Sequence, residues 1–150
     1  MLVRPASPED AEAIGELLDA FNREFGEPTP GAPWLANRIV ELLAQDTLVL
    51  LGGSGPDGLA VLRFRPGIWS AALECYLAEL YVKPELRGQG IGRALMEAVL
   101  IAARERGADH IDLGTSEADM AARALYESLG FINRERRPDG PINYLYEREL

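Results

Sequence analysis

The chain has 150 residues, of which 47 % are hydrophobic and 26 % charged, which is ordinary for a globular protein that can bury a core. This composition excludes fibrous and disordered classes, and the sequence holds no apolar run of about 18 residues that would predict a membrane span. The single cysteine, Cys75, excludes an internal disulfide, and no Cys/His cluster predicts a metal site. We expect a cytoplasmic protein without a signal peptide or a membrane partner.

The net charge of −9 is unevenly distributed along the chain. Residues 1–60 hold ten acidic and three basic side chains, a net charge of −7, whereas residues 61–95 hold five basic and three acidic ones, a net charge of +2. An acidic protein repels nucleic-acid phosphates, so we expect no nucleic-acid partner. The basic segment at residues 61–95 can still bind one small polyphosphate.

The first half of the chain predicts a strand, two helices and a hairpin. A short strand at residues 2–4 is followed by Ser7, which resembles an N-cap with Asp10 three residues later. Apolar residues at helical spacing predict the first helix, and Pro and Gly residues predict a loop at residues 26–33. The expected elements are helices at residues 8–25 and 34–44 and hairpin strands at 47–51 and 59–64.

The second half predicts a long strand, a well-defined helix and further alternating elements. Gly90 opens an amphipathic pattern that ends at Gly107, a residue type typical of helix C-termini. The expected elements are strands at residues 71–82 and 110–114, helices at 90–106 and 119–129, a strand from 131 onward and a last strand at 143–149. This order predicts an α+β or mixed α/β sheet with helices on both faces.

The segment with the clearest chemistry is Arg87-Gly88-Gln89-Gly90-Ile91-Gly92, between the long strand and the amphipathic helix. Helix N-termini have unpaired N–H groups and a positive partial charge, and they bind phosphate readily. Glycine allows the backbone to approach an anion, and Arg87 and Arg93 can add charge-assisted hydrogen bonds.

Three interpretations of this loop compete. A P-loop is excluded because no Lys-Ser/Thr pair follows the glycines. A dinucleotide-binding loop has its third glycine out of register, although Asp109 and Asp112 lie about twenty residues further on and keep that interpretation open. A plain glycine-rich turn is the third alternative.

Two blocks of sequence, residues 80–92 and residues 122–131, together resemble the GNAT superfamily of N-acetyltransferases. Arg87 to Gly92 matches the superfamily's acyl-CoA loop, Gln/Arg-x-x-Gly-x-Gly/Ala, and Leu80-Tyr81-Val82 matches the Leu-x-Val strand ending before it. Residues 122–131, Ala-Arg-Ala-Leu-Tyr-Glu-Ser-Leu-Gly-Phe, match the second signature, Ala-x-x-Leu-Tyr-x-x-x-Gly-Phe. The blocks occur in the superfamily's order, and the resemblance is strong over about residues 72–131.

The resemblance implies one GNAT-like domain over residues 1–150, with a mixed, mostly antiparallel sheet, helices on both faces and a splayed parallel strand pair. The splayed strands are residues 72–82 and 110–114, and acetyl-CoA is the implied cosubstrate, with no metal. The implied cofactor-binding residues are Leu80, Tyr81, Val82, Arg87, Gly88, Gln89, Gly90, Ile91, Gly92, Arg93, Asp119 and Tyr126.

The resemblance also implies direct attack of an amine on the thioester. Glu79, just before the Leu-x-Val ending, is the candidate general base, with Glu74 as a weaker alternative. Tyr126 matches the usual general acid for the departing thiolate. An outward, solvated Glu79 and a packed amphipathic Tyr126 remain the structural alternatives.

Several other residues have a structural role as an alternative to a role in the site. Asp119 stands where many relatives place an asparagine that contacts the pantetheine arm, and an N-cap is the preferred interpretation of this residue. His110 and Cys75 are expected to have no catalytic role. Trp34 and Trp69 lie in segments that border the acceptor pocket in the superfamily, with core packing as the alternative.

For the acceptor substrate, the sequence offers charge as its main indication. The acidic N-terminal half favours a small cationic amine, although acidic side chains also serve solubility. A protein N-acetyltransferase and a non-catalytic acyl-CoA-binding regulatory module remain alternatives, and the presence of both Glu79 and Tyr126 favours an enzyme. A homodimer that uses residues 143–149 is compatible with the sequence.

Overall fold

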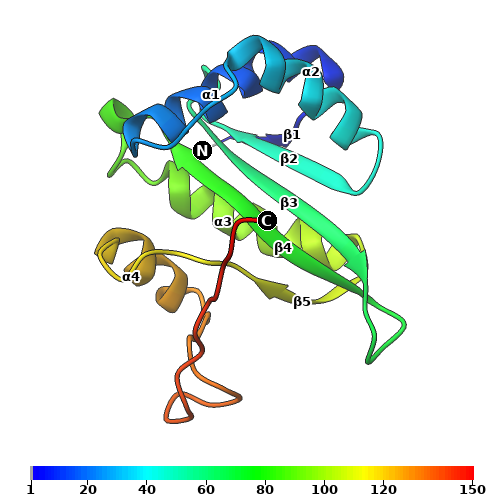
Figure 1. The fold of residues 1–150 in the computed structure, drawn as a ribbon, viewed down its shortest axis with the longest axis vertical. Helices are drawn as coiled ribbons and strands as arrows, with labels where there is room; N and C mark the ends of the chain where they lie inside the picture. The colour runs from blue at the N-terminus through cyan, green and yellow to red at the C-terminus, as the bar shows by residue number, and fades with distance from the viewer. Residues whose placement is uncertain (1) are drawn as a thin grey trace. The chain divides into compact units, whose positions relative to one another are not determined.

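The computed structural model describes residues 2–150, whose contacts divide into two compact units, up to Asp112 and from Leu113 onward. The first unit consists of a sheet and three α-helices (Figure 1). Its elements are β1 (Val3–Pro5), α1 (Ala11–Glu24), α2 (Ala32–Leu43), β2 (Thr47–Gly52), β3 (Gly58–Pro66), β4 (Leu73–Val82), α3 (Ile91–Glu105) and β5 (Ala108–Asp112). Short 3-10 helices at Pro8–Asp10 and Pro84–Leu86 precede α1 and α3.

The five strands form one mixed sheet in the order β1-β2-β3-β4-β5. Pairing is antiparallel from β1 to β4 and parallel between β4 and β5. The expected mixed, mostly antiparallel sheet with one parallel pair is therefore confirmed. Among residues 2–150, no helix combines the length and apolar character needed to cross a membrane.

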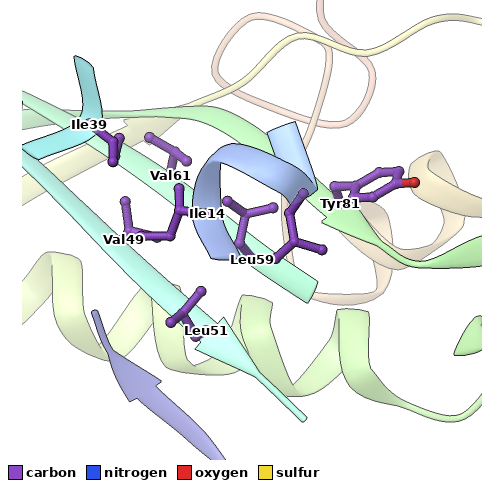
Figure 2. Packing of buried hydrophobic residues seen from close by; sticks show 8 residues of the cluster. Ile14, Ile39, Val49, Leu51, Leu59, Val61 and Tyr81 are labelled. Atoms are coloured by element: carbon purple, nitrogen blue, oxygen red, sulfur yellow. The ribbon is translucent and has the colours of Figure 1, made fainter. Parts of the chain in front are cut away.

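Helices α1 and α2 cover one face of the sheet. Ile14 and Leu17 of α1 and Ile39 of α2 pack on the residues of β2, β3 and β4 that alternate toward them (Figure 2). The sheet side of this cluster consists of Val49, Leu51, Leu59, Val61 and Tyr81. The apolar residues that alternate along the strands and those at helical spacing along α1 therefore form one core.

Helix α3 covers the opposite face. Its Ile91 and Leu95 side chains lie so close to Gly52 of β2 that a Cβ there would come within 3.1–3.2 Å of them. Leu95, Met96 and Val99 are fully buried. The expected helices on both faces are thus confirmed within the first unit (Figure 1).

The second unit contains one helix, α4 (Met120–Ser128), and little regular structure after it. The expected strands from residue 131 onward and at residues 143–149 are wrong. Over the described residues of this unit, β-pairing is limited to one bridge, between Arg134 and Ile142. Arg134 and Ile142 flank a turn that contains Pro138 and Gly140, residue types that end strands, and the apolar residues after Asn143 remain without a sheet partner.

Several other boundaries differ from expectation by about one turn or less, and two of these differences have a clear physical reason. Helix α2 begins at Ala32, two residues early, because Pro33 suits the first helical turn, where no amide hydrogen bond is needed. Strand β5 is shifted two residues toward the N-terminus, because its pairing with β4 starts at Leu73 and Ala108. The remaining predicted strands and helices of the first unit are confirmed.

The close crossing of α1 and α2 leads to a stability prediction. A Cβ on Gly15 would lie 2.5 Å from the Ala32 carbonyl oxygen and 2.9 Å from the Ala36 nitrogen. Alanine normally stabilises a helix relative to glycine, but here it would push two backbones apart. We expect Gly15→Ala to lower the free energy of unfolding by about 1–3 kcal/mol.

Urea denaturation measures this change, and Glu16→Ala at the next, exposed position is the control, with an expected change within about 0.5 kcal/mol. A Gly15→Ala variant as stable as the unmodified protein would contradict the close helix crossing.

Candidate functional site

Strand β4 has a partner on both sides for only half of its length. Its parallel pairing with β5 runs from Leu73 to Tyr76 and ends at the pair Tyr76 and Asp112. From Leu77 to Val82 the strand is paired with β3 alone. The N–H and C=O groups on the other edge of this half have no strand partner, and an extended ligand can pair with such groups.

An irregularity in the pairing of β3 and β4 lies at the same place. Val61 pairs with Glu79, but the next pair is Leu62 with Leu77, so Ala78 is an extra residue in β4. Such a bulge bends a strand and re-aims its side chains. It marks the position where β4 leaves β5.

The glycine-rich loop connects the open half of β4 to α3. Gly88 and Gly90 have φ angles of 76° and 89°, which glycine adopts without strain. Residues 87–90 are exposed, whereas Ile91 is buried and anchors the helix start. Gly90 is the N-cap and offers no side-chain acceptor to the first-turn amides. The loop therefore presents a helix N-terminus suited to an anion.

Arg87 binds a carboxylate of α1. Its Nη1 and Nη2 atoms donate to the two oxygens of Glu24, both at 2.8 Å, and its Nε donates to the Val82 carbonyl at 3.0 Å. The Tyr81 hydroxyl also donates to Glu24, at 3.2 Å. Hydrogen bonds from Arg87 hold the pKa of Glu24 below its ordinary range, despite an opposing contribution from burial.

The ring of Tyr81 completes this arrangement. It stacks on Phe21 of α1, with the centroids 4.9 Å apart, and the guanidinium carbon of Arg87 lies 5.5 Å from its centroid. The side chain of Tyr81 therefore packs against α1. Only the backbone of Tyr81 is left for the predicted contact with a cofactor. The contact with Glu24 was not predicted, because no local pattern links residues 63 positions apart.

Glu79 and Glu74 lie on the same face of β4 but in different environments. Glu79 is half-buried, and burial raises the pKa of its carboxyl group. Glu74 accepts from Arg65 Nε at 2.6 Å in an ion pair. A carboxylate with a raised pKa and no bound cation accepts a proton more readily, so Glu79 has the more basic environment of the two.

Tyr126 and Asp119 belong to the second unit. Tyr126 lies in α4, is buried, and packs edge to face on Phe131 at 5.9 Å between centroids. Burial, followed by the charge of Asp119, raises the pKa of Tyr126 to about 12. Asp119 accepts a hydrogen bond from the Ala122 amide at 3.0 Å, which confirms it as an N-cap.

The remaining candidates have plain structural positions. Cys75 is buried, and burial raises its thiol pKa to about 11, so it stays protonated and is a poor nucleophile. His110 is exposed on β5. Trp34 and Trp69 are 55 % and 95 % exposed, which excludes core packing for both. Residues 2–150 contain no group of three or more His, Cys, Asp or Glu side chains that could hold a metal.

Comparison with known proteins agrees with this arrangement. The family model described as acetyltransferase (GNAT) family matches residues 14–131. The structure superposes on the crystal structure of a protein of Arthrobacter sp. FB24, described as a candidate acetyltransferase, with a TM-score of 0.90 and 44 % sequence identity. That match covers 100 % of this chain and 96 % of the other.

Curated relatives match over shorter stretches. The mycothiol acetyltransferase of Thermobispora bispora is 52 % identical over 58 residues, 37 % of this chain and 20 % of the relative. The thialysine N-epsilon-acetyltransferase of Bos taurus is 34 % identical over 73 residues, 49 % of this chain and 42 % of the relative. The chain thus spans less than half the length of both relatives. Because the family model matches most of the chain, the protein belongs to the acetyltransferase (GNAT) family.

Proposed function

We propose that the protein is an acetyl-CoA-dependent N-acetyltransferase that transfers the acetyl group directly to a primary amine of a small cationic molecule. The observation that carries this proposal is the open half of β4, which leads into an exposed glycine-rich loop at the N-terminus of α3. An extended polar arm can pair with the open half of β4, and a polyphosphate at the end of that arm can then bind at the loop.

The residues of the loop fit the phosphate end of acetyl-CoA. The space around Gly88 and Gly90 is open, so their backbone is accessible to a bulky anion. In this proposal the backbone amides from Gln89 to Arg93 bind the pyrophosphate. Arg87 holds the loop against Val82 and Glu24, while backbone groups near Leu80 and Val82 bind the pantetheine arm and polarise the thioester carbonyl.

Two side chains handle protons in this proposal. Acetyl-CoA supplies an acyl group activated as a thioester. Glu79 accepts the proton that the ammonium group must lose before its nitrogen attacks the carbonyl carbon. As the carbon–nitrogen bond forms and the carbon–sulfur bond breaks, the nitrogen loses its second proton, the departing thiolate takes up a proton, and Tyr126 donates a hydrogen bond to the sulfur. Since the phenol is a weaker acid than a thiol, hydrogen bonding accounts for most of its effect.

The charge of the protein supports a cationic acceptor. The excess of acidic side chains in residues 1–60 attracts ammonium groups, and the named relative from Bos taurus acts on thialysine. A protein N-terminus and a purely regulatory acyl-CoA-binding role are the competing functions. A regulatory acyl-CoA-binding protein would not require Glu79 or Tyr126.

Thiol release from acetyl-CoA tests the proposal. The protein is incubated with acetyl-CoA and a panel of polyamines, amino acids, aminoglycosides and peptides, and free thiol and acetylated product are measured. Release accelerated by a small amine supports the proposal, and release only with peptides favours protein N-acetylation. Binding of CoA with no acceleration by any amine would refute the enzymatic role.

The Glu24–Arg87 pair leads to a prediction in which the sign of the change in KM distinguishes two roles of Arg87. If Arg87 acts as a support for the loop, Glu24→Gln loosens the loop and raises the KM for acetyl-CoA by about 2–5-fold, the scale of a partly exposed ion pair. If Arg87 instead binds phosphate, loss of Glu24 frees the guanidinium and lowers that KM. Steady-state kinetics distinguish the two, and Glu41→Gln, which breaks the exposed Arg38–Glu41 pair of α2, is the control.

Tyr126→Phe removes the proposed donor to sulfur and little else, because the ring remains available to pack on Phe131. We expect kcat to fall by roughly 10–1000-fold with the Kd for acetyl-CoA nearly unchanged. Turnover with saturating amine and isothermal titration with acetyl-CoA measure the two quantities. Unchanged kcat would remove Tyr126 from this role.

Glu79→Gln is expected to lower kcat by about 10²–10⁴-fold and to make the protein more stable at neutral pH. The raised pKa means that folding disfavours the ionised carboxylate, so its destabilising effect is present above the folded pKa and disappears below the unfolded pKa, near 4.3. Thermal unfolding at pH 7.5 and at pH 4 measures the difference. Equal stability of both proteins at pH 7.5 would contradict the desolvation of Glu79.

A further inference from the structure

The open face of the sheet beyond α1 and α2 carries a line of polar side chains next to Glu79. Arg63 of β3 is paired with Tyr76 of β4, and Val61, two residues before Arg63, is paired with Glu79. Residues paired across an antiparallel ladder share a face, so Arg63 and Glu79 lie on one face of neighbouring strands, on either side of the bulge at Ala78. A cation and the proposed base therefore lie on the same face of the sheet.

The guanidinium of Arg63 is incompletely bonded. Its Nε atom is buried and, among the buried side-chain nitrogen and oxygen atoms of residues 2–150, it alone has no hydrogen-bond partner. Its one ion pair joins Nη2 to Asp46 Oδ1 at 3.5 Å, and its side chain is 41 % exposed. This long contact leaves the outer end of the guanidinium accessible to a better acceptor.

Neighbouring charges restrict what that acceptor can be. Arg65, on the same face, is already bound to Glu74, and Asp112 is paired with Tyr76 on the other side of β4. A second anion near Glu74 or Asp112 would be repelled, so Arg63 is the favourable position for one. One guanidinium binds either anion, but it balances the single charge of a carboxylate and only part of the double charge of a phosphate.

We propose that Arg63 binds a carboxylate of the acceptor, so that the acceptor is an amino acid or a close aminocarboxylate whose amine faces Glu79. This inference rests on the proposed function, because it assigns the acceptor of the same reaction. Tyr76, which is 43 % exposed and directly opposite Arg63, offers its ring and hydroxyl to the part of the molecule between the two charges. Arg63 is thus a specificity-determining residue.

The experiment compares cationic amino acids with the amines that they yield on decarboxylation, such as lysine with cadaverine and ornithine with putrescine, and with the corresponding amino acid amides. We expect kcat/KM to be at least 10-fold higher for the amino acid of each set. Arg63→Gln is expected to remove this preference by raising the KM for amino acids 10–100-fold, the scale of a charge-assisted hydrogen bond. Arg63→Lys should restore part of it.

Two controls separate the outcomes. Arg65→Gln changes a cation on the same strand and face that is bound to Glu74, and it should keep the preference for carboxylates. The KM of each variant for acetyl-CoA, measured with the decarboxylated amine, shows that the variant is folded. Equal use of both series by the unmodified protein, or a preference that survives Arg63→Gln, would overturn the carboxylate assignment while leaving N-acetylation intact. Release with neither series but with another amine, such as an aminoglycoside, would likewise overturn the carboxylate assignment alone, whereas release with no amine at all would refute both proposals.

Discussion

The end of parallel pairing at Tyr76 and Asp112 is the constraint on which the rest of the site depends. A strand buried on both edges offers no backbone group to a ligand, and a strand with two free edges is prone to aggregation. β4 combines a first half held between β3 and β5 with a second half held by β3 alone. The first half fixes the direction of the second half, and the second half leads into the glycine-rich loop and α3.

Two glutamates have different acid–base properties in this protein because their surroundings differ. Glu24 receives two hydrogen bonds from Arg87, stays ionised, and supports the loop. Glu79 is desolvated without a bound cation, so its carboxylate holds a proton more readily. Neither environment is a property of glutamate itself. Each is set by the neighbouring strand or helix, as expected where structure tunes acid–base chemistry.

Sequence reasoning succeeds here where the signal is local. The α3 helix and its loop follow from apolar spacing and from glycines that adopt positive φ, and the Asp119 cap follows from its place before α4. The Glu24–Arg87 pair and the register of Arg63 with Tyr76 depend on tertiary contacts that no window of sequence contains. The strands expected after residue 131 fail because apolar alternation requires a partner strand to become a sheet.

Burial of Cys75 has a practical consequence for this chain. It is the one cysteine of the sequence, its side chain is buried, and the raised thiol pKa keeps it uncharged. Thiol reagents react with the thiolate, so the folded protein gives almost no background signal with them. A cysteine engineered at an exposed position, such as Gln89 in the loop, would accept a fluorophore at that position alone. The natural sequence is therefore already suited to single-site labelling for measurements of loop motion.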